Sequence, residues 1–433
     1  MLSSKKLTPA LIVAVAAGPA FAQESPGALG ASAPPSGGFE TFSLLICGLL
    51  VMFMAAGFAM KQGGLVRAKS AASVSLRSFA TYALAGLMMW LVSYNLMFMV
   101  RPGGLLGVFE PWSLDGVDAP ARGMVAAEWF FRMGCVAMAA MIVSGALAER
   151  MRLWPFLIFA AVFTGLIFPI EASWQWGGGY LRAKWAFVDL AGSTVIHSAA
   201  GWAALAGAIV LGPRQGKYDG RMVHAMPGSN MPLAALGAFI LWLGWFGLSA
   251  GSHIIHDGAF DAGTVAKIFI NTNMSAAASV ITAMLLTQII FKKVDLTVVL
   301  NGAVAGLVSI SAEPFAPAIW QAVVIGAMGG VIVSVAVPVL DRLYIDDVVG
   351  AIPAHLLCGI WGTFITPWSN SDANYLGQTV AIVMVGAFVF IMSLLVWVAL
   401  KYTIGVRLSA EQEQIGLDKT ELGLDAYPSF SKL

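Results

Sequence analysis

Charged residues are scarce in this chain of 433 residues. Lys, Arg, Asp and Glu make up 11% of it, against 59% hydrophobic residues, whereas an ordinary soluble domain has about 25% charged residues. So little charge cannot cover a surface that faces water. The sequence therefore predicts an integral membrane protein whose main surroundings are the lipid bilayer.

Cysteine and net charge are scarce as well. The three cysteines, Cys47, Cys135 and Cys358, lie in apolar runs, so neither a disulfide framework nor a zinc pattern is indicated. The formal net charge of +1 excludes the strongly basic surface that is usual for nucleic-acid binding. No nucleophile–base pair and no cofactor motif stands out. We therefore expect no enzyme, no cofactor and no nucleic-acid partner.

The N-terminal segment is typical of a signal peptide. Residues 1–22 contain two lysines, then a short apolar run, and end in Ala20-Phe21-Ala22, which is a small-x-small cleavage pattern. Residues 23–38 are rich in Pro, Gly, Ser and Ala and indicate a flexible periplasmic lead-in. We expect a membrane domain at 39–407 and, at 408–433, a cytoplasmic tail whose polar, mixed-charge composition is typical of a solvated segment.

The membrane domain is predicted to be all-α, because each apolar run must satisfy its own backbone hydrogen bonds in lipid. Loops after odd-numbered runs carry most of the Lys and Arg, which indicates an outside N-terminus and a cytoplasmic C-terminus. The eighth and tenth runs are short and contain glycine. The eleven expected spans are 41–61, 77–100, 124–147, 153–172, 190–212, 231–251, 264–290, 296–312, 318–340, 348–367 and 378–404.

Two segments repeat the same spacing of four residues. Asp189, Gly192, His197 and Gly201 in the fifth span recur as Asp347, Gly350, His355 and Gly359 in the tenth. These spans are predicted to run in opposite directions, and each is the fifth of its unit. The pattern indicates an inverted repeat of 5+5 helices plus one, the architecture in which transport pathways lie between the halves.

The two histidines are the main candidate site. The simplest alternative is that His197 and His355 are ordinary buried side chains, each bonded to a carbonyl group. An ionisable group within a span is costly and tends to face a cavity or a partner. Paired neutral imidazoles, one donating and one accepting, give an apolar tube a polar lining without fixed charge. The pattern favours a pore for a small hydrogen-bonding molecule, or a proton relay.

The chain resembles the ammonium transporters, the Amt branch of the Amt/Rh family. The resemblance extends in order over nearly the whole chain after the signal peptide. The matching motifs are GGLVR at 63–67, GALAER at 145–150, WGGG at 176–179, the segment 189–197, GWFGLSAGS at 244–252, HLLCGI at 355–360 and the tail at 406–418.

The resemblance implies a homotrimer in the cytoplasmic (inner) membrane of a bacterium, with one pore in each subunit. It implies that ammonium is captured outside, loses a proton and passes the histidine pair as ammonia. It also implies a PII-type signalling protein as a partner of the tail. Carried over by position, Trp176, Ser252 and Phe131 correspond to the capture site, and Asp189 to a buried carboxylate that supports it.

The residue chemistry agrees with these roles and leaves simpler ones open. Ammonium is a cation with only donors, so the ring face of Trp176 and the hydroxyl of Ser252 suit it. Trp176 is otherwise an interfacial tryptophan, and Ser252 or Asp189 a helix cap. His253, His256 and Asp257 lie close together in sequence, but without a further evident ligand they do not indicate a metal site.

One departure from the family concerns the gate. Two stacked phenylalanines usually close the pore below the capture site, and their positions correspond here to Cys135 and Leu248. The gate is then wider, or neighbours such as Phe130, Phe131 or Trp245 rebuild it. Two alternatives to transport follow: an ammonium sensor that does not conduct, and a channel for another small solute such as methylamine or water.

Overall fold

The computed structural model describes residues 37–428, and within them the fold is almost entirely helical. The predicted signal peptide and nearly all of the lead-in lie outside these residues. The α-helices are α1 Gly38–Leu65, α2 Ala71–Met88, α3 Tyr94–Phe98, α4 Arg122–Ala146, α5 Leu153–Val162, α6 Phe168–Ser173, α7 Tyr180–Trp185, α8 Ala199–Leu211, α9 Met231–Asp257, α10 Ala262–Phe291, α11 Leu296–Ile310, α12 Ile319–Arg342, α13 Cys358–Ile365, α14 Tyr375–Thr403 and α15 Ala410–Ile415.

Shorter elements connect these helices or extend them. The π-helical segments are η2 Met89–Ser93, η3 Phe163–Ile167, η4 Ser193–Ser198, η5 Ile352–Leu357 and η7 Asp418–Leu422. Two 3₁₀ turns, η1 Ala68–Ser70 and η6 Thr366–Trp368, and a two-stranded antiparallel hairpin, β1 Tyr218–Asp219 with β2 Met222–Val223, complete the list.

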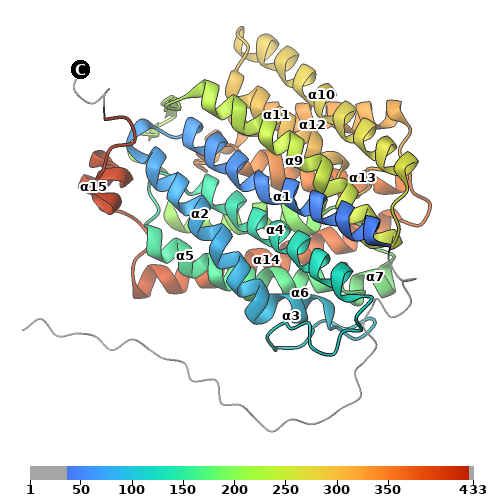
Figure 1. Ribbon diagram of the computed structural model, residues 1–433. Helices are drawn as coiled ribbons and strands as arrows, with labels where there is room; N and C mark the ends of the chain where they lie inside the picture. The colour runs from blue at the N-terminus through green and yellow to red at the C-terminus, as the bar shows by residue number, and fades with distance from the viewer. Residues whose placement is uncertain (1–36, 429–433) are drawn as a thin grey trace, which may run out of the picture.

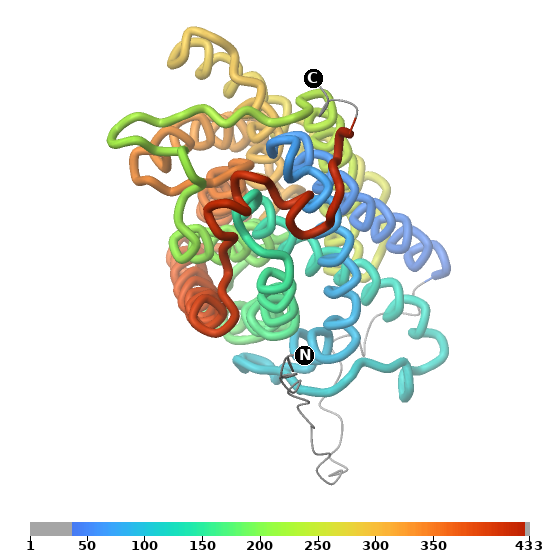
Figure 2. Tube along the Cα trace, turned by 90° about the vertical axis from the view of Figure 1, so that its left-hand side faces the viewer, coloured from blue at the N-terminus to red at the C-terminus, as the bar shows by residue number. Residues whose placement is uncertain are grey.

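The long helices form one bundle and run roughly along a common direction (Figure 1). α15 and η7 lie at one end of the bundle, which we call the tail face. α6 and α7 lie at the other end, which we call the Trp176 face because Trp176 is in the short connection between these two helices. Figure 2 looks onto the tail face, where the red C-terminal segment crosses the ends of several helices.

Among the described residues, nine helical segments are long and apolar enough to cross a membrane. Two expected spans are shorter in the structure: the eighth is the 15-residue α11, and the tenth is η5 joined to α13. α4 is the most enclosed of the nine, whereas α10 and α14 expose most of their apolar residues. Such exposed apolar faces suit lipid rather than water.

Glycine allows a close contact between two of the long helices. α1 packs along α9 at Gly57 and Gly237, and a Cβ at Gly237 would lie only 2.2 Å from the backbone nitrogen of Lys61. Small residues at such crossings are typical of helix packing in lipid. The contact holds the last turns of α1 inside the bundle, so that Lys61 is buried.

Buried ion pairs join helix ends at the tail face. Glu149 accepts hydrogen bonds from the Arg67 backbone at 3.0 Å and from Arg214 at 3.1 Å. Asp346 accepts three hydrogen bonds from Arg214, between 2.8 and 2.9 Å. Burial raises the pKa of Asp346, but the hydrogen bonds of Arg214 and the charge of Arg150 outweigh it and lower the pKa to about 2. Asp346 therefore stays ionised and holds Arg214 in place.

The C-terminal tail docks onto the tail face of the same chain. The Asp418 carboxylate accepts from the backbone N–H groups of Ala72 and Ser73 at 3.0 and 2.7 Å. Glu421 accepts from the Leu153 N–H at 2.8 Å. These carboxylates satisfy free N–H groups in the first turns of α2 and α5, as helix caps do. The tail is thereby tied to two membrane-spanning segments.

Candidate functional site

His197 and His355 meet inside the bundle. Their Nδ1 atoms are 3.3 Å apart and their ring centroids 5.3 Å apart. Both residues are buried: His197 is 0% exposed and His355 is 3% exposed. At this distance one Nδ1–H donates a hydrogen bond that the other Nδ1 accepts, so two neutral imidazoles pair through these atoms, whereas His197 Nε2 is buried without a partner among the described residues. The two histidines thus form a polar pair in an apolar interior.

The pair forms because its two segments cross in opposite directions. Thr194 and Thr363 share a hydrogen bond of 2.7 Å between their hydroxyls. Gly359 lies against Ser198, with only 2.9 Å from an added Cβ to the Ser198 nitrogen. Residues near the start of one segment therefore contact residues near the end of the other. Both histidines lie on π-helical turns, η4 and η5, a distortion that is frequent at functional sites.

A carboxylate organises the start of η4. Asp189 is fully buried, and its two oxygens accept from the backbone N–H groups of four residues at 2.8 to 3.0 Å. Gly192 within this turn has a φ of 93°, which L-residues with a side chain rarely adopt. The four donors are Gly192, Ser193, Thr194 and Val195.

Asp347 has the same arrangement before η5. Its oxygens accept from the backbone N–H groups of Gly350 at 3.1 Å and Ile352 at 2.6 Å. Gly350 also has a positive φ, of 73°. The repeated sequence spacing therefore corresponds to a repeated local structure: carboxylate, left-handed glycine, π-helical turn and histidine.

Aromatic rings flank the histidine pair on both sides. Trp245 stacks on His197 with centroids 4.8 Å apart and planes 22° apart, and its Nε1 donates to Ser311 at 2.9 Å. The Phe58 ring lies 6.4 Å from the His355 ring. Trp245, which the sequence analysis named among the neighbours that rebuild the gate, covers one face of His197.

The residues expected at the capture site gather at the Trp176 face. Trp176 Nε1 donates to the Asp189 carbonyl at 3.0 Å, which joins this residue to the buried carboxylate turn. Phe131 packs on Gly251, the residue before Ser252: an added Cβ at Gly251 would lie 2.3 Å from the Phe131 ring. The Ser252 hydroxyl is buried and has no hydrogen-bond partner among the described residues. An unused acceptor therefore lies next to this cluster.

Arg132 is a component of this cluster that the sequence analysis did not identify. Its guanidinium carbon lies 4.3 Å from the Trp176 ring centroid and 5.9 Å from that of Phe131. The side chain is 5% exposed, and Glu128 lies 3.7 Å away. The ring face that suits ammonium is therefore covered by the protein's own cation. A charged residue in the middle of an expected span was the available signal.

The two expected gate positions are both fully buried. Cys135 follows Phe131 by four residues on α4, so both lie on one face of this helix. Leu248 lies three residues after Trp245 and four before Ser252 on α9, again on one face. Both positions thus lie along the helix faces that carry the Trp176-face cluster and the histidine-stacking tryptophan.

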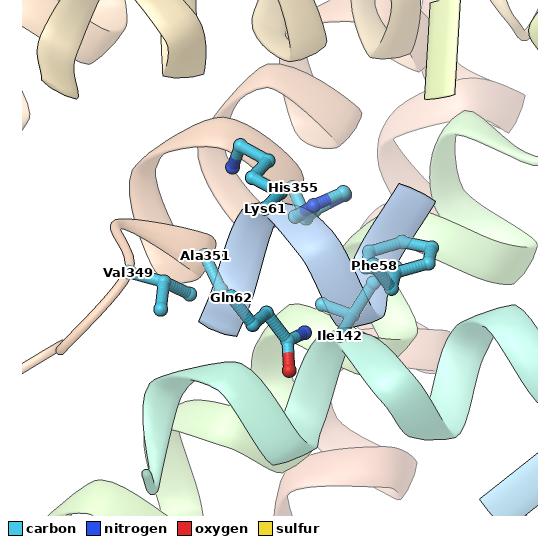
Figure 3. A pocket seen from close by; sticks show the side chains of 7 residues that line it. All are labelled: Phe58, Lys61, Gln62, Ile142, Val349, Ala351 and His355. Carbon is cyan, nitrogen blue, oxygen red and sulfur yellow. The ribbon is translucent and has the colours of Figure 1, made fainter. Parts of the chain in front are cut away.

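A small cavity adjoins His355 on the side of the tail face. Its volume is about 10 Å³, room for roughly one water molecule. Figure 3 shows the side chains around it, which come from α1, α4 and the segment that leads into η5. Lys61 belongs to this lining and is a second buried cation that the sequence analysis missed. The lining residues are Phe58, Lys61, Gln62, Ile142, Val349, Ala351 and His355.

The described residues contain no group of three or more His, Cys, Asp and Glu side chains that could hold a metal ion. His253 instead lies 3.4 Å from Asp257, one helical turn further along α9. This pair is compatible with a helix-surface contact and needs no ion.

Fold and site together define a multi-pass helical membrane protein with a buried polar pair at its centre. The chain belongs to the Ammonium Transporter Family, whose model matches residues 42–427. It is 38% identical to the ammonium transporter Amt2 of Archaeoglobus fulgidus, over 89% of this chain and 87% of that protein. It is 33% identical to the ammonium transporter of Bacillus subtilis, over 90% and 98% of the two chains.

Solved structures agree on the fold. The chain is similar to a structure described as a Sensor Amt Protein, with a TM-score of 0.83 and 28% identity over 89% of this chain and 98% of that one. It also superposes on Mep2 of Candida albicans with a TM-score of 0.78, at 24% identity and 86% coverage of both chains.

Proposed function

We propose that this protein moves ammonium across a cell membrane and that the moving species passes the His197–His355 pair as uncharged ammonia. The observation that carries the proposal is the pair itself: two buried neutral rings in hydrogen-bond contact, within a chain that belongs to a family of ammonium transporters. Ammonia is neutral and both donates and accepts hydrogen bonds, so it can replace the contact that the rings make with each other.

The charge of ammonium explains why we expect the neutral form, ammonia, to pass the histidine pair. Taking an ion into an apolar interior costs far more than taking in a neutral polar molecule. The cluster of Trp176, Phe131, Ser252 and Asp189 offers aromatic faces, a hydroxyl and negative potential where ammonium first meets the protein. We infer that ammonium loses its proton there, before Cys135 and Leu248, and that ammonia continues to the histidines. The proton crosses separately along the hydrogen-bonded imidazole pair, so that net charge moves and a current results.

The architecture that we propose has eleven spans, with the short helices α11 and η5–α13 as the eighth and tenth. Two units of five would form an inverted repeat, supported by the matching local structure at Asp189 and Asp347. The Trp176 face would lie outside and the tail face in the cytoplasm of a bacterial cell, with the inner membrane as the site. Residues 1–22 would be the signal peptide and 23–38 the lead-in.

We further propose a homotrimer with a regulatory tail at 408–433. The support within this chain is the docking of Asp418 and Glu421 onto the first turns of α2 and α5. A PII-type protein that displaced the tail would change the packing of two spanning segments.

A second candidate function is that of an ammonium sensor that binds without conducting. Arg132 covers the Trp176 ring, Lys61 lies beside His355, and the gate positions are not aromatic. The likeness to a structure described as a Sensor Amt Protein points in the same direction. Passage through such an interior would be slow, while binding at the Trp176 face would remain.

Current recordings on a solid-supported membrane separate these functions. Proteoliposomes with the full-length protein receive pulses of ammonium, methylammonium and potassium. A transporter gives sustained currents with ammonium, smaller ones with methylammonium and none with potassium. A sensor gives only brief binding transients, whose decay rate does not depend on the lipid-to-protein ratio. Equal responses to ammonium and potassium would exclude both functions.

A further inference from the structure

Lys61 is a buried cation whose partners form a defined polar site. The side chain is 4% exposed, and its Nζ donates to Asn301 Oδ1 at 2.6 Å. Lysine within a span is costly, and such residues almost always have partners and mark functional positions. The resemblance to the ammonium transporters assigns no role to either residue.

Asn301 is fixed in the orientation that this contact needs. Its Nδ2 donates to the Val349 carbonyl at 2.9 Å, so its Oδ1 is the atom that remains for Lys61. Gly350 leaves the space for the amide, because a Cβ there would lie 2.2 Å from Asn301 Nδ2. The backbone around η5 therefore holds an acceptor ready for an ammonium group.

Asp347 supplies the negative charge of the site. Its charge acts on Lys61 without a direct ion pair, so Asn301 is the residue that contacts the ammonium group. Its place relative to His355 is that of Asp189 relative to His197: in each pair the histidine follows the carboxylate by eight positions. At the Trp176 face, Asp189 is joined to the aromatic cluster by the hydrogen bond from Trp176. At the tail face, its counterpart Asp347 lines the same cavity as Asn301.

The site lies between two cavities. Lys61 lines the small cavity beside His355, whereas Asn301 and Asp347 line a cavity of about 170 Å³ toward the tail face. Val349 belongs to both linings. The hydrogen bond from Lys61 to Asn301 therefore joins the walls of the two cavities. A molecule that left the histidine pair in this direction would meet the lysine first.

We propose that Asn301 and Asp347 form a binding site for a primary ammonium group, that the Lys61 Nζ occupies it as a tethered ligand, and that this occupancy limits passage toward the tail face. The limit on passage rests on the proposed transport function, but the occupancy does not. A lysine ammonium group carries the same charge as free ammonium and presents three N–H donors, one fewer than the free ion. Ammonia arriving from the histidine pair would find the acceptor taken, and once protonated there it would meet a like charge.

The effect on passage is tested by exchanging Lys61. Lys61→Met keeps an unbranched apolar chain and removes the charge, so the ammonium-evoked current should rise roughly threefold or more. Lys61→Arg keeps the charge and should give no increase. Equal or lower current in Lys61→Met, in a variant that elutes and melts like the wild type, would overturn the limiting role.

The occupancy is tested without transport. Lys61→Ala removes the atoms of a propylammonium ion and leaves Asn301 and Asp347 in place. Added 1-propylammonium should raise the melting temperature of Lys61→Ala by several degrees, as a ligand of the folded state does. It should leave the wild type, whose site is filled, and Lys61→Ala/Asn301→Leu unchanged.

A rise in all three proteins, or in none, would overturn the ammonium site. If propylammonium stabilises Lys61→Ala but no variant gives a current, the ammonium site is confirmed and the transport function is contradicted. Lys61→Met, which fills the space without a charge, should not respond to propylammonium, and a response there would also speak against a site that recognises the ammonium group.

Discussion

Replacing Asp189 by alanine is expected to destabilise the protein strongly and to abolish transport. The substitution leaves four backbone N–H groups without an acceptor in a fully buried turn. Each hydrogen bond to a charged group contributes about 1.5–3 kcal/mol, and unpaired buried donors carry their full desolvation cost. A melting temperature lower by on the order of 10 °C is the expected result in detergent or nanodiscs.

Two matched variants make this result specific. Asp189→Asn keeps one acceptor oxygen and should fall between the wild type and Asp189→Ala. Asp347→Ala removes the corresponding carboxylate at the tail face, where two backbone hydrogen bonds reach the side chain, and should cost less. An Asp189→Ala protein that melts within about 2 °C of the wild type would contradict the organising role of this carboxylate.

Replacing Arg132 by glutamine is expected to strengthen the response to ammonium. The guanidinium group lies 4.3 Å from the Trp176 ring and competes with ammonium for the same ring face. A cation over an aromatic ring is worth about 0.5–2 kcal/mol, which corresponds to a change of several-fold in affinity. The ammonium concentration that gives half-maximal current should therefore fall several-fold in Arg132→Gln.

Arg132→Lys is the control for this prediction, because it keeps the charge near Trp176. Its half-maximal concentration should stay near that of the wild type. If Arg132→Gln weakens the response instead, Arg132 holds the cluster together and does not compete with the substrate. The tryptophan fluorescence of the variants reports whether the environment of the rings has changed.

The sequence predicted an all-helical membrane domain, because long apolar runs are compatible only with helices in lipid. It also indicated that the two histidine segments are related, because Asp, Gly and His have the same spacing in both, and this spacing can be read without knowing how the helices pack. The structure adds what the spacing did not contain: Gly192 and Gly350 adopt left-handed conformations, and both histidines lie on π-helical turns.

Arg132 and Lys61, the buried cations near the candidate site, were missed for different physical reasons. α4 is enclosed on all sides, so its sequence has no polar face that would predict which way the Arg132 side chain points. Lys61 stood at the predicted end of the first span, where a lysine is ordinarily a membrane-boundary residue that reaches toward water. The structure continues α1 to Leu65, because the close contact with α9 keeps these turns inside the bundle.

The short eighth and tenth spans have a similar explanation. α11 is almost completely buried, and its neighbour η5–α13 is distorted at its start. Helices that are surrounded by other helices need not match the thickness of the lipid, so their length carries less information about a crossing. Hydropathy alone therefore locates these segments without fixing their ends.

The most direct test of the central claim compares the ammonium-evoked current of the wild type with that of the His197→Ala/His355→Ala double variant. Both proteins are reconstituted at equal density in the same lipid, and melting curves establish that the variant is folded. Loss of the pair's polar contact should reduce the current by about tenfold or more, or open the protein to potassium. A folded double variant with the current and the ion selectivity of the wild type would contradict passage along the histidines.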